Sequence, residues 1–297
     1  MNRSASSYWY NSWPRVLQAF PYHWIIQPSE EEIKQVFRDT HAIALRYSTP
    51  VDAPHGRISY HVLCEDEDFD ITSMRHKARL DVKHGLEYAC IERIPFERLA
   101  GEGWQLRQET MARQGRDGAE NGKWWRSLCL SAEGLPGVEA WGAFHENQLV
   151  ASILGMRCDD TYCFLYAQSA SAHLKFKVNN AIFFAVTRQA LHQDNISCAF
   201  FGLHSLDAPS SVDDFKFRME FKPKPVRQRV VFNPLIEPFI NPLTHRMIDG
   251  LHRRRPGNYF LSKTEGMLRF YLQGSQSLCN QEWPECLEEK RPLILAS

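Results

Sequence analysis

The sequence lacks the short motifs by which several common enzyme classes are recognised. It contains no His-Glu-x-x-His and no Cys-x-x-Cys, so zinc-ligand spacing is missing. It also has no Gly-x-Ser-x-Gly, no Walker phosphate loop and no Gly-x-Gly-x-x-Gly after a strand. A serine hydrolase, a P-loop nucleotidase and a dinucleotide-dependent dehydrogenase therefore lose their main sequence support, and no metal is expected.

An excess of charge and a long apolar run are missing too. The chain has 35 basic and 35 acidic residues, so no overall field draws it to nucleic acid or to an anionic membrane, and such binding needs a local patch. Its apolar runs are far shorter than a membrane span, and the first thirty residues show no apolar signal core. With 297 residues, 43% of them hydrophobic, we expect a cytoplasmic globular protein of two domains or one large one.

The eight cysteines do not form a disulfide or metal pattern. They are scattered, and several fall in predicted strands, where a free thiol packs as a small apolar group. We therefore expect reduced, structural cysteines at positions 64, 90, 129, 158, 163, 198, 279 and 286.

The most informative stretch is residues 138–232. Polar residues 145–148 separate two apolar segments, which predicts a hairpin, and the aromatic-rich run 162–167 predicts a third strand. Apolar residues at helical spacing predict a helix over 178–192. Cys198–Leu203 is continuously apolar, which is typical of a central strand parallel to a neighbour. A second helix and a last strand near 225–231 complete a mixed α/β layout.

The part before this stretch also alternates helices and strands. Ser29-Glu30-Glu31-Glu32 is a capping box and predicts the start of a helix. We then expect strands at 41–47 and 57–64, a helix over 73–84 that ends at Gly85, a strand at 86–92, and a helix from Pro95 toward Arg113. The aromatic residues before position 28 are expected to pack as an irregular arm.

Three cationic segments admit both a structural and a binding interpretation. Arg75, Arg79 and Lys83 share one helix face, which suits a solvated surface or a phosphorylated ligand. The glycine-rich residues 114–122 suit a linker, although Arg113 and Arg116 flank it. The run 252–255 suits a solvated helix end or an anionic partner.

The order of these elements resembles the GNAT superfamily of acyltransferases, and more closely its bacterial FemAB-like branch, in which two such units share one chain. The matching segments are Met74–Arg79, Arg113–Arg116, Leu203–Asp207 and Phe215–Phe221. The resemblance implies two GNAT-like units, each a mostly antiparallel twisted sheet flanked by helices. The expected division is an N-terminal arm at 1–27, units at 28–113 and 138–232, a connector at 114–137, and a helical extension at 233–297.

The resemblance also implies where a donor would bind. In this family a glycine-rich turn before a helix holds a pyrophosphate through its backbone N–H groups. The matching segment here, 168–177, has no glycine, so the usual coenzyme A cradle is altered. Glu220 replaces a glycine expected in the Phe-Lys-x-Arg-x-Gly-Phe segment. The donor-binding candidates are Ser169, Lys175, Lys177, Asn179, Lys216 and Arg218.

The catalytic candidates follow predicted strands. Open α/β sheets bind ligands at the carboxyl ends of strands, and His204 and Asp207 follow Cys198–Leu203, while Tyr166 lies near the end of another strand. His204 suits a general base oriented by Asp207, and Tyr166 suits a general acid. A histidine without a task in a polar loop is the alternative interpretation.

Two functions remain open from the sequence. The first is an N-acyltransferase that moves an acyl or aminoacyl group from acyl-CoA, such as acetyl-CoA, or from aminoacyl-tRNA to a small-molecule or peptide amine. The second is a catalytically silent GNAT-like module that binds a metabolite or a protein partner.

Overall fold

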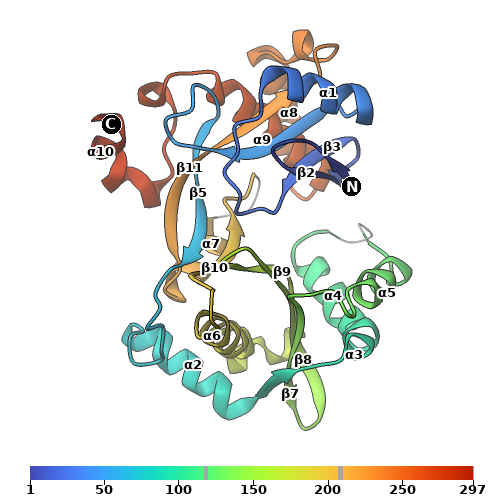
Figure 1. The fold of residues 1–297 in the computed structure, drawn as a ribbon, viewed down its shortest axis with the longest axis vertical. Helices are drawn as coiled ribbons and strands as arrows, with labels where there is room; N and C mark the ends of the chain where they lie inside the picture. Colours follow the sequence, from blue (N-terminus) through green and yellow to red (C-terminus); the bar gives the residue numbers. More distant parts are fainter. Residues whose placement is uncertain (117–119, 207–209, 297) are drawn as a thin grey trace. The chain divides into compact units, whose positions relative to one another are not determined.

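The computed structural model describes residues 1–116, 120–206 and 210–296 and contains two compact units (Figure 1). The first comprises Met1–Val62, Gly202–Pro209 and Pro223–Ser297, and the second comprises Leu63–Phe201 and Ser210–Lys222. The chain therefore passes between the units four times. The predicted connector at 114–137 and its flanking helices all fall within the second unit.

The first unit holds a mixed sheet with the strand order β1-β2-β3-β4-β11-β5. Strand β3 pairs parallel with β4, whereas β4 pairs antiparallel with β11. The strands are β1 (Asn2–Arg3), β2 (Tyr8–Trp13), β3 (Val16–Phe20), β4 (Ala44–Thr49), β5 (Arg57–Cys64) and β11 (Lys222–Phe232).

The N-terminal residues differ from the irregular arm that the sequence predicts. They form the antiparallel hairpin β2–β3, which continues the sheet beside β4. Trp9 is only 1% exposed and meets the ring of Tyr47 edge-on, with ring centroids 5.9 Å apart. The aromatic side chains in this region, which lie among prolines, do not alternate with polar residues in the way that predicts a strand. Their packing against the sheet nevertheless orders the segment.

Helices cover the sheet of the first unit through two apolar clusters. Helix α1 (Glu30–Thr40) begins as the capping box predicts, because Ser29 accepts a hydrogen bond from the Glu32 N–H, and it buries Ile33, Val36 and Phe37. The second cluster joins β4 and β11 to α9. The C-terminal elements are η2 (Glu237–Phe239), α8 (Pro242–Arg254), α9 (Tyr259–Gly274), η3 (Leu278–Asn280), η4 (Glu285–Lys290) and α10 (Arg291–Ala296).

The second unit has the strand order β10-β9-β8-β7-β6. The predicted meander is confirmed: β7 (Val138–His145), β8 (Gln148–Cys158) and β9 (Thr161–Ser169) pair antiparallel in succession. The predicted parallel strand is confirmed too, since β10 (Cys198–Leu203) pairs parallel with β9, although only its first three residues are fully buried and residues 201–203 are half-buried. Strand β6 is Cys90–Arg93.

Helices lie on both faces of this second sheet (Figure 1). One face carries α2 and α6, and the other carries α3, α4 and α5, whose cluster is centred on the fully buried Trp125. The elements are α2 (His76–Tyr88), α3 (Phe96–Gly101), α4 (Gly103–Arg113), α5 (Gly122–Ser131), η1 (Ser171–Phe176), α6 (Val178–Leu191) and α7 (Ser210–Arg218).

Gly85 does not end its helix, contrary to the sequence prediction. Helix α2 continues to Tyr88, and the strand expected at 86–92 shortens to β6. A Cβ at Gly85 would lie 2.7 Å from the Ala181 Cβ and closer still to the Lys177 carbonyl oxygen. The glycine therefore permits the close approach of α2 to the start of α6, a role that only tertiary packing shows.

Over the described part of the chain, every helix is too short or too polar to cross a lipid bilayer.

Candidate functional site

Strands β9 and β10 separate partway along their length in the second unit. Their parallel register pairs Cys198 with Thr161 and ends where Phe200 meets Cys163. Strand β9 continues to Ser169, and its other edge stays paired with β8 to that residue. Residues 164–169 thus have no ladder pairing to β10. The Ser169 N–H donates to Thr110 Oγ1 at 3.1 Å and its carbonyl oxygen accepts from Arg113 at 2.9 Å, so residues 164–168 form the part of this edge that can pair with an extended ligand that carries amides.

The N-terminus of α6 lies in the chain segment after β9. Lys177 precedes the helix in the left-handed conformation (φ 63°), and no side chain caps the first N–H groups of the helix. An uncapped helix N-terminus favours an anion through its N–H groups and its dipole. The 3₁₀ helix η1 occupies the segment in which the sequence resemblance predicts a phosphate-binding turn.

Three predicted binding residues lie along this segment. Lys175 is exposed, with its ammonium 4.9 Å from the centre of the Phe176 ring. The Lys177 ammonium lies 3.5 Å from an Asp81 carboxylate oxygen. Asn179 is half-buried in the first turn of α6. The structure thus brings two cations and an amide to the start of one helix.

Arg113 ties the end of β9 to η1. Its guanidinium donates to the Ser169 carbonyl oxygen at 2.9 Å, to Ser169 Oγ at 3.1 Å and to Ser171 Oγ at 2.7 Å. Loss of hydration lowers the pKa of Arg113, and the nearby Glu109 carboxylate partly offsets this. Glu109 also accepts the Ser171 N–H at 2.7 Å. From the sequence, Arg113 was identified only as a cation beside the glycine-rich residues 114–122, because about 56 residues separate it from Ser169.

Tyr166 lies on β9 among aromatic side chains. Its ring meets Trp124 and Trp125 edge-on, at centroid distances of 6.2 and 5.7 Å. The Arg107 guanidinium lies 4.9 Å from the ring centre and also pairs with Glu120, with Nε 2.8 Å from Oε2. The cation over the ring and the two indoles fix the orientation of the phenol.

An aromatic and histidine cluster beside η1 was missed in the sequence. Tyr88 is stacked between His145 and Phe176, at ring distances of 3.8 and 4.1 Å, and its hydroxyl lies 2.8 Å from His173 Nδ1. Desolvation, followed by the charge of Glu146, raises the pKa of Tyr88. Its members come from α2, β7 and η1, so no local spacing could have indicated it.

Lys216 and Arg218 have different surroundings. The Lys216 ammonium donates to Asp213 Oδ1 at 2.6 Å, and the lysine is only 7% exposed. Arg218 is exposed at the last residue of α7. Glu220, which stands where the family has glycine, adopts a left-handed φ of 66°, so the turn forms without the glycine. Lys216 therefore has a structural partner, whereas Arg218 faces solvent.

His204 belongs to the first unit, whereas the β9–α6 segment belongs to the second. Its Nδ1 is 3.1 Å from Ser59 Oγ, and its ring stacks on Tyr60 at 4.4 Å. Its carbonyl oxygen accepts hydrogen bonds from Arg46 at 3.0 Å and from Gln228 at 3.1 Å. Ser59 is thus a partner of the imidazole that the sequence did not indicate. Asp207, the predicted orienting residue, lies outside the described residues.

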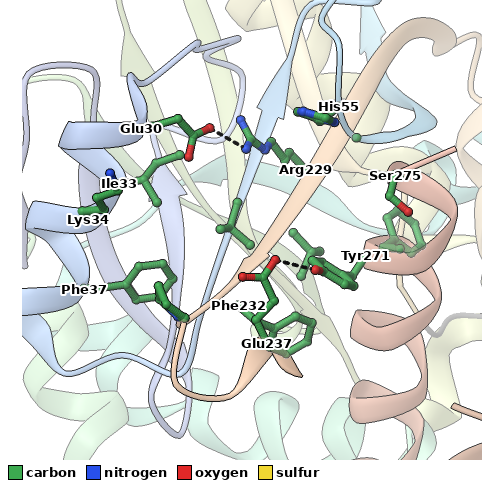
Figure 2. A pocket seen from close by; sticks show the side chains of 16 residues that line it. Glu30, Ile33, Lys34, Phe37, His55, Arg229, Phe232, Glu237, Tyr271 and Ser275 are labelled. Atoms are coloured by element: carbon green, nitrogen blue, oxygen red, sulfur yellow. Dashed lines mark hydrogen bonds and ion pairs between the residues drawn. The ribbon is translucent and has the colours of Figure 1, made fainter. Parts of the chain in front are cut away.

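A pocket of about 380 Å³ in the first unit was also missed (Figure 2). Phe37, Phe232 and Phe270 are among its apolar lining residues. Arg229 donates to Glu30 at 2.8 Å, and the Tyr271 hydroxyl donates to Glu237 at 2.7 Å. Burial and this hydrogen bond raise the pKa of Tyr271 to about 12. With these polar groups paired to each other, the pocket offers mainly apolar surface.

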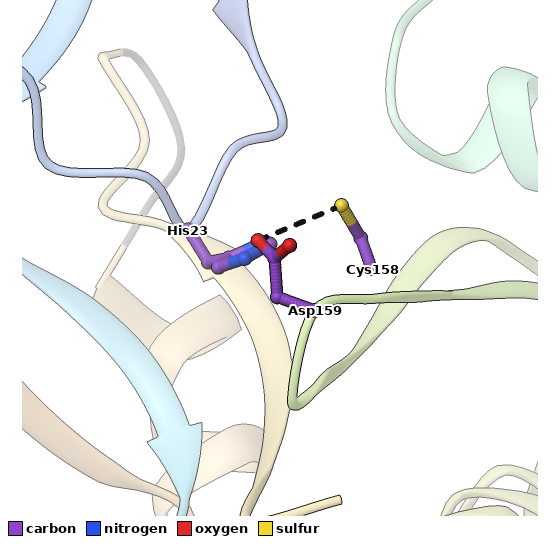
Figure 3. A group of neighbouring side chains, drawn as sticks. All are labelled: His23, Cys158 and Asp159. Carbon is purple, nitrogen blue, oxygen red and sulfur yellow. Dashed lines mark hydrogen bonds between the residues drawn. The ribbon is translucent and has the colours of Figure 1, made fainter. Parts of the chain in front are cut away.

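Cys158 and Asp159 lie at the turn between β8 and β9, where Cys158 Sγ is 3.9 Å from Asp159 Oδ2 (Figure 3). His23, drawn with them, belongs to the first unit. Among the described residues, therefore, neither unit by itself gathers three metal-ligating side chains at this turn.

Comparison with known proteins gives a likeness of fold alone. No family model matches the chain, and no curated protein matches its sequence. Among solved structures, FemX has a TM-score of 0.50 at 11% identity, over 70% of this chain and 77% of that one. L-PGS from Bacillus licheniformis has a TM-score of 0.49 at 12% identity, over 73% and 77%. The C-terminal domain of a putative lysylphosphatidylglycerol synthetase from Agrobacterium fabrum also has 0.49, at 13% identity over 74% and 79%. The strand order, the early end of the β9–β10 pairing and the likeness to FemX agree with the fold that the sequence resemblance predicts, and the chain has a FemX-like fold.

Proposed function

We propose that the protein is an N-acyltransferase that moves an acyl or aminoacyl group from a thioester or ester donor to an amine. The donor binds the second unit, along the edge of β9 and at the N-terminus of α6. The observation that carries this proposal is the early end of the β9–β10 register at Phe200, because it leaves residues 164–168 with an edge that an extended donor can pair with.

Acyl-CoA fits these features in chemistry. Its pantetheine arm carries two amides, which suit an open strand edge, and its pyrophosphate suits an uncapped helix N-terminus. Lys175 and Lys177 add positive charge at the same end of α6. An aminoacyl-tRNA offers phosphodiesters to the same cations and an ester in place of the thioester. The two donors differ in how many phosphates the protein neutralises, and therefore in how steeply their binding depends on salt.

The reaction needs few groups from the protein. The amine nitrogen attacks the carbonyl carbon of the donor and forms a carbon–nitrogen bond. The carbon–sulfur bond of a thioester, or the carbon–oxygen bond of an ester, then breaks. A base takes the amine proton, and an acid protonates the departing thiolate or alkoxide. Tyr166 is our candidate acid. His204 is our candidate base, and its imidazole hydrogen bond to Ser59 supplies an orienting contact of the kind a base requires.

Donor binding is tested by thermal denaturation with acetyl-CoA, longer acyl-CoAs and charged tRNA. A donor at about 100 times its Kd adds about 2.7 kcal/mol to the free energy of unfolding, which raises Tm by roughly 5–10 °C. Arg113→Lys keeps the charge but loses the fork that holds Ser169 and Ser171, so it should weaken donor binding. Arg126→Lys, at an exposed site on α5, is the matched control. No Tm change with any donor would contradict the proposal.

A silent module is the second candidate, and one contact favours it. The Glu109 carboxylate holds the Ser171 N–H, so a negative charge stands beside the segment that would receive phosphates. For a silent module, neither wild type nor Glu109→Gln should bind any donor. If the protein is a transferase, the wild type binds and Glu109→Gln binds at least as tightly.

A further inference from the structure

Helix α8 exposes three of its four large apolar side chains to solvent. Leu243, Met247 and Leu251 follow one another at four-residue spacing and are 67%, 63% and 47% exposed. At 3.6 residues per turn this spacing places them along one face. Leu235 and Phe239, which precede the helix, are exposed as well.

The inner side of α8 is more polar than its outer side. His245 Nε2 lies 3.1 Å from Glu265 of α9, and only Ile248 joins the apolar cluster beneath. A helix on the surface of a globular protein normally shows the opposite arrangement, with its apolar stripe turned to the core. The outward stripe therefore suits a partner that is apolar itself.

Cations surround this stripe. Arg246, Arg253, Arg254 and Arg255 are all exposed, and the single acid of the helix, Asp249, pairs with Arg253 at 2.8 Å. The whole chain has no net charge, so this local excess is a distinct feature. Arg254 follows Leu243 by eleven residues, which brings it to within roughly 20° of Leu243 around the helix axis. Charge and apolar surface are therefore interleaved.

We propose that α8 binds the surface of an anionic lipid bilayer, with Leu243, Met247 and Leu251 in the boundary between headgroups and acyl chains. Arginine suits this position because its stem lies along apolar surface while its guanidinium reaches the headgroup phosphates. A second copy is disfavoured because a twofold contact would set the same arginines against one another. This inference does not depend on the proposed transferase activity.

The test is sedimentation with vesicles of phosphatidylcholine alone or with 30% phosphatidylglycerol. The wild type should bind only the anionic vesicles, and less so as salt rises. One arginine near such a surface contributes about 1 kcal/mol, a fivefold change in the partition coefficient. Arg246→Gln, Arg254→Gln and Arg255→Gln together should therefore weaken binding about a hundredfold. This variant keeps the Arg253–Asp249 pair.

The matched control removes the same charge elsewhere, by Arg3→Gln, Arg38→Gln and Arg126→Gln, and should bind like the wild type. A second variant, which combines Leu243→Gln, Met247→Gln and Leu251→Gln, should also lose binding while its Tm stays unchanged, because the three side chains are exposed. Met247→Trp should show a blue shift of its added fluorescence on anionic vesicles only.

Several results would overturn the proposal. They are equal binding to neutral vesicles, unchanged binding by either α8 variant, and failure of the wild type to bind. A dimeric wild type that becomes monomeric when Leu243→Gln, Met247→Gln and Leu251→Gln are combined would instead assign this face to contact between copies.

Discussion

Replacing Gly85 by alanine tests the packing that holds the proposed donor site. In an exposed helix interior this change stabilises, since alanine has the better helix propensity by about 1 kcal/mol. At Gly85 the added Cβ would lie 2.7 Å from Ala181 Cβ and closer still to the Lys177 carbonyl oxygen. Neither neighbour is the end of a flexible side chain, so α2 and α6 must move apart.

Overpacking of this kind costs about 1–3 kcal/mol, which exceeds the gain in propensity. We expect Gly85→Ala to lower the free energy of unfolding by about 1–2 kcal/mol and Tm by about 3–6 °C. Gly250→Ala is the control: nothing lies within 4 Å of a Cβ built there, so it should stabilise by about 0.5–1 kcal/mol. Urea denaturation measures both. Equal stability of the two variants would refute the packing argument.

Gly85→Ala should also affect binding of the donor. The Lys177 carbonyl accepts the Ala181 N–H at 3.1 Å and so belongs to the first turn of α6. Moving it disturbs the N–H groups that we propose hold the donor phosphates. Gly85→Ala should therefore weaken donor binding, measured by calorimetry at a temperature where the variant is folded, and Gly250→Ala should not.

Three further substitutions test other parts of the account. Lys216→Ala should lower the free energy of unfolding by about 1.5–3 kcal/mol in urea denaturation, because it removes the charged hydrogen bond from Lys216 to the buried Asp213, whereas wild-type stability would deny the pair a structural role. Burial lowers the pKa of His61 to about 3, so the folded protein keeps it neutral while the unfolded chain protonates it below pH 6.5. Stability should fall by about 1.4 kcal/mol per pH unit on acidification from pH 6.5 toward 3, and His61→Gln should flatten this slope; an unchanged slope would exclude His61 as its source. His204→Ala should lower turnover about 10²- to 10⁴-fold with donor binding intact, because it removes the group that takes the amine proton; near-normal turnover would exclude this base.

The sequence predicted those elements whose pattern is local. The hairpin β7–β8, strand β9 and helix α6 each show a period in their own residues, and β10 is apolar throughout. The sequence could not separate the two uses of a glycine: Gly85 looked like a helix end, but it serves the contact with α6.

The site was harder to predict than the fold because its contacts are distant in sequence. Arg113 meets Ser169 across 56 residues, and Tyr88 meets His173 across 85. Lys216 and Arg218 looked equivalent in the sequence, and only burial distinguishes the paired lysine from the exposed arginine. Similarly, the basic run at 252–255 has two possible roles in the sequence, and the exposed apolar side chains of α8 beside it favour the role of binding an anionic partner.

The central claim is that the donor binds along β9 and at the start of α6. Hydrogen–deuterium exchange with and without acyl-CoA or charged tRNA tests it most directly, because a ligand that pairs with a strand edge slows exchange of the amides it covers. We predict that a donor protects peptides spanning residues 164–168 and 177–181, and that Arg113→Lys reduces this protection. Protection confined to other segments, such as those lining the pocket between α1 and α9, would contradict the account.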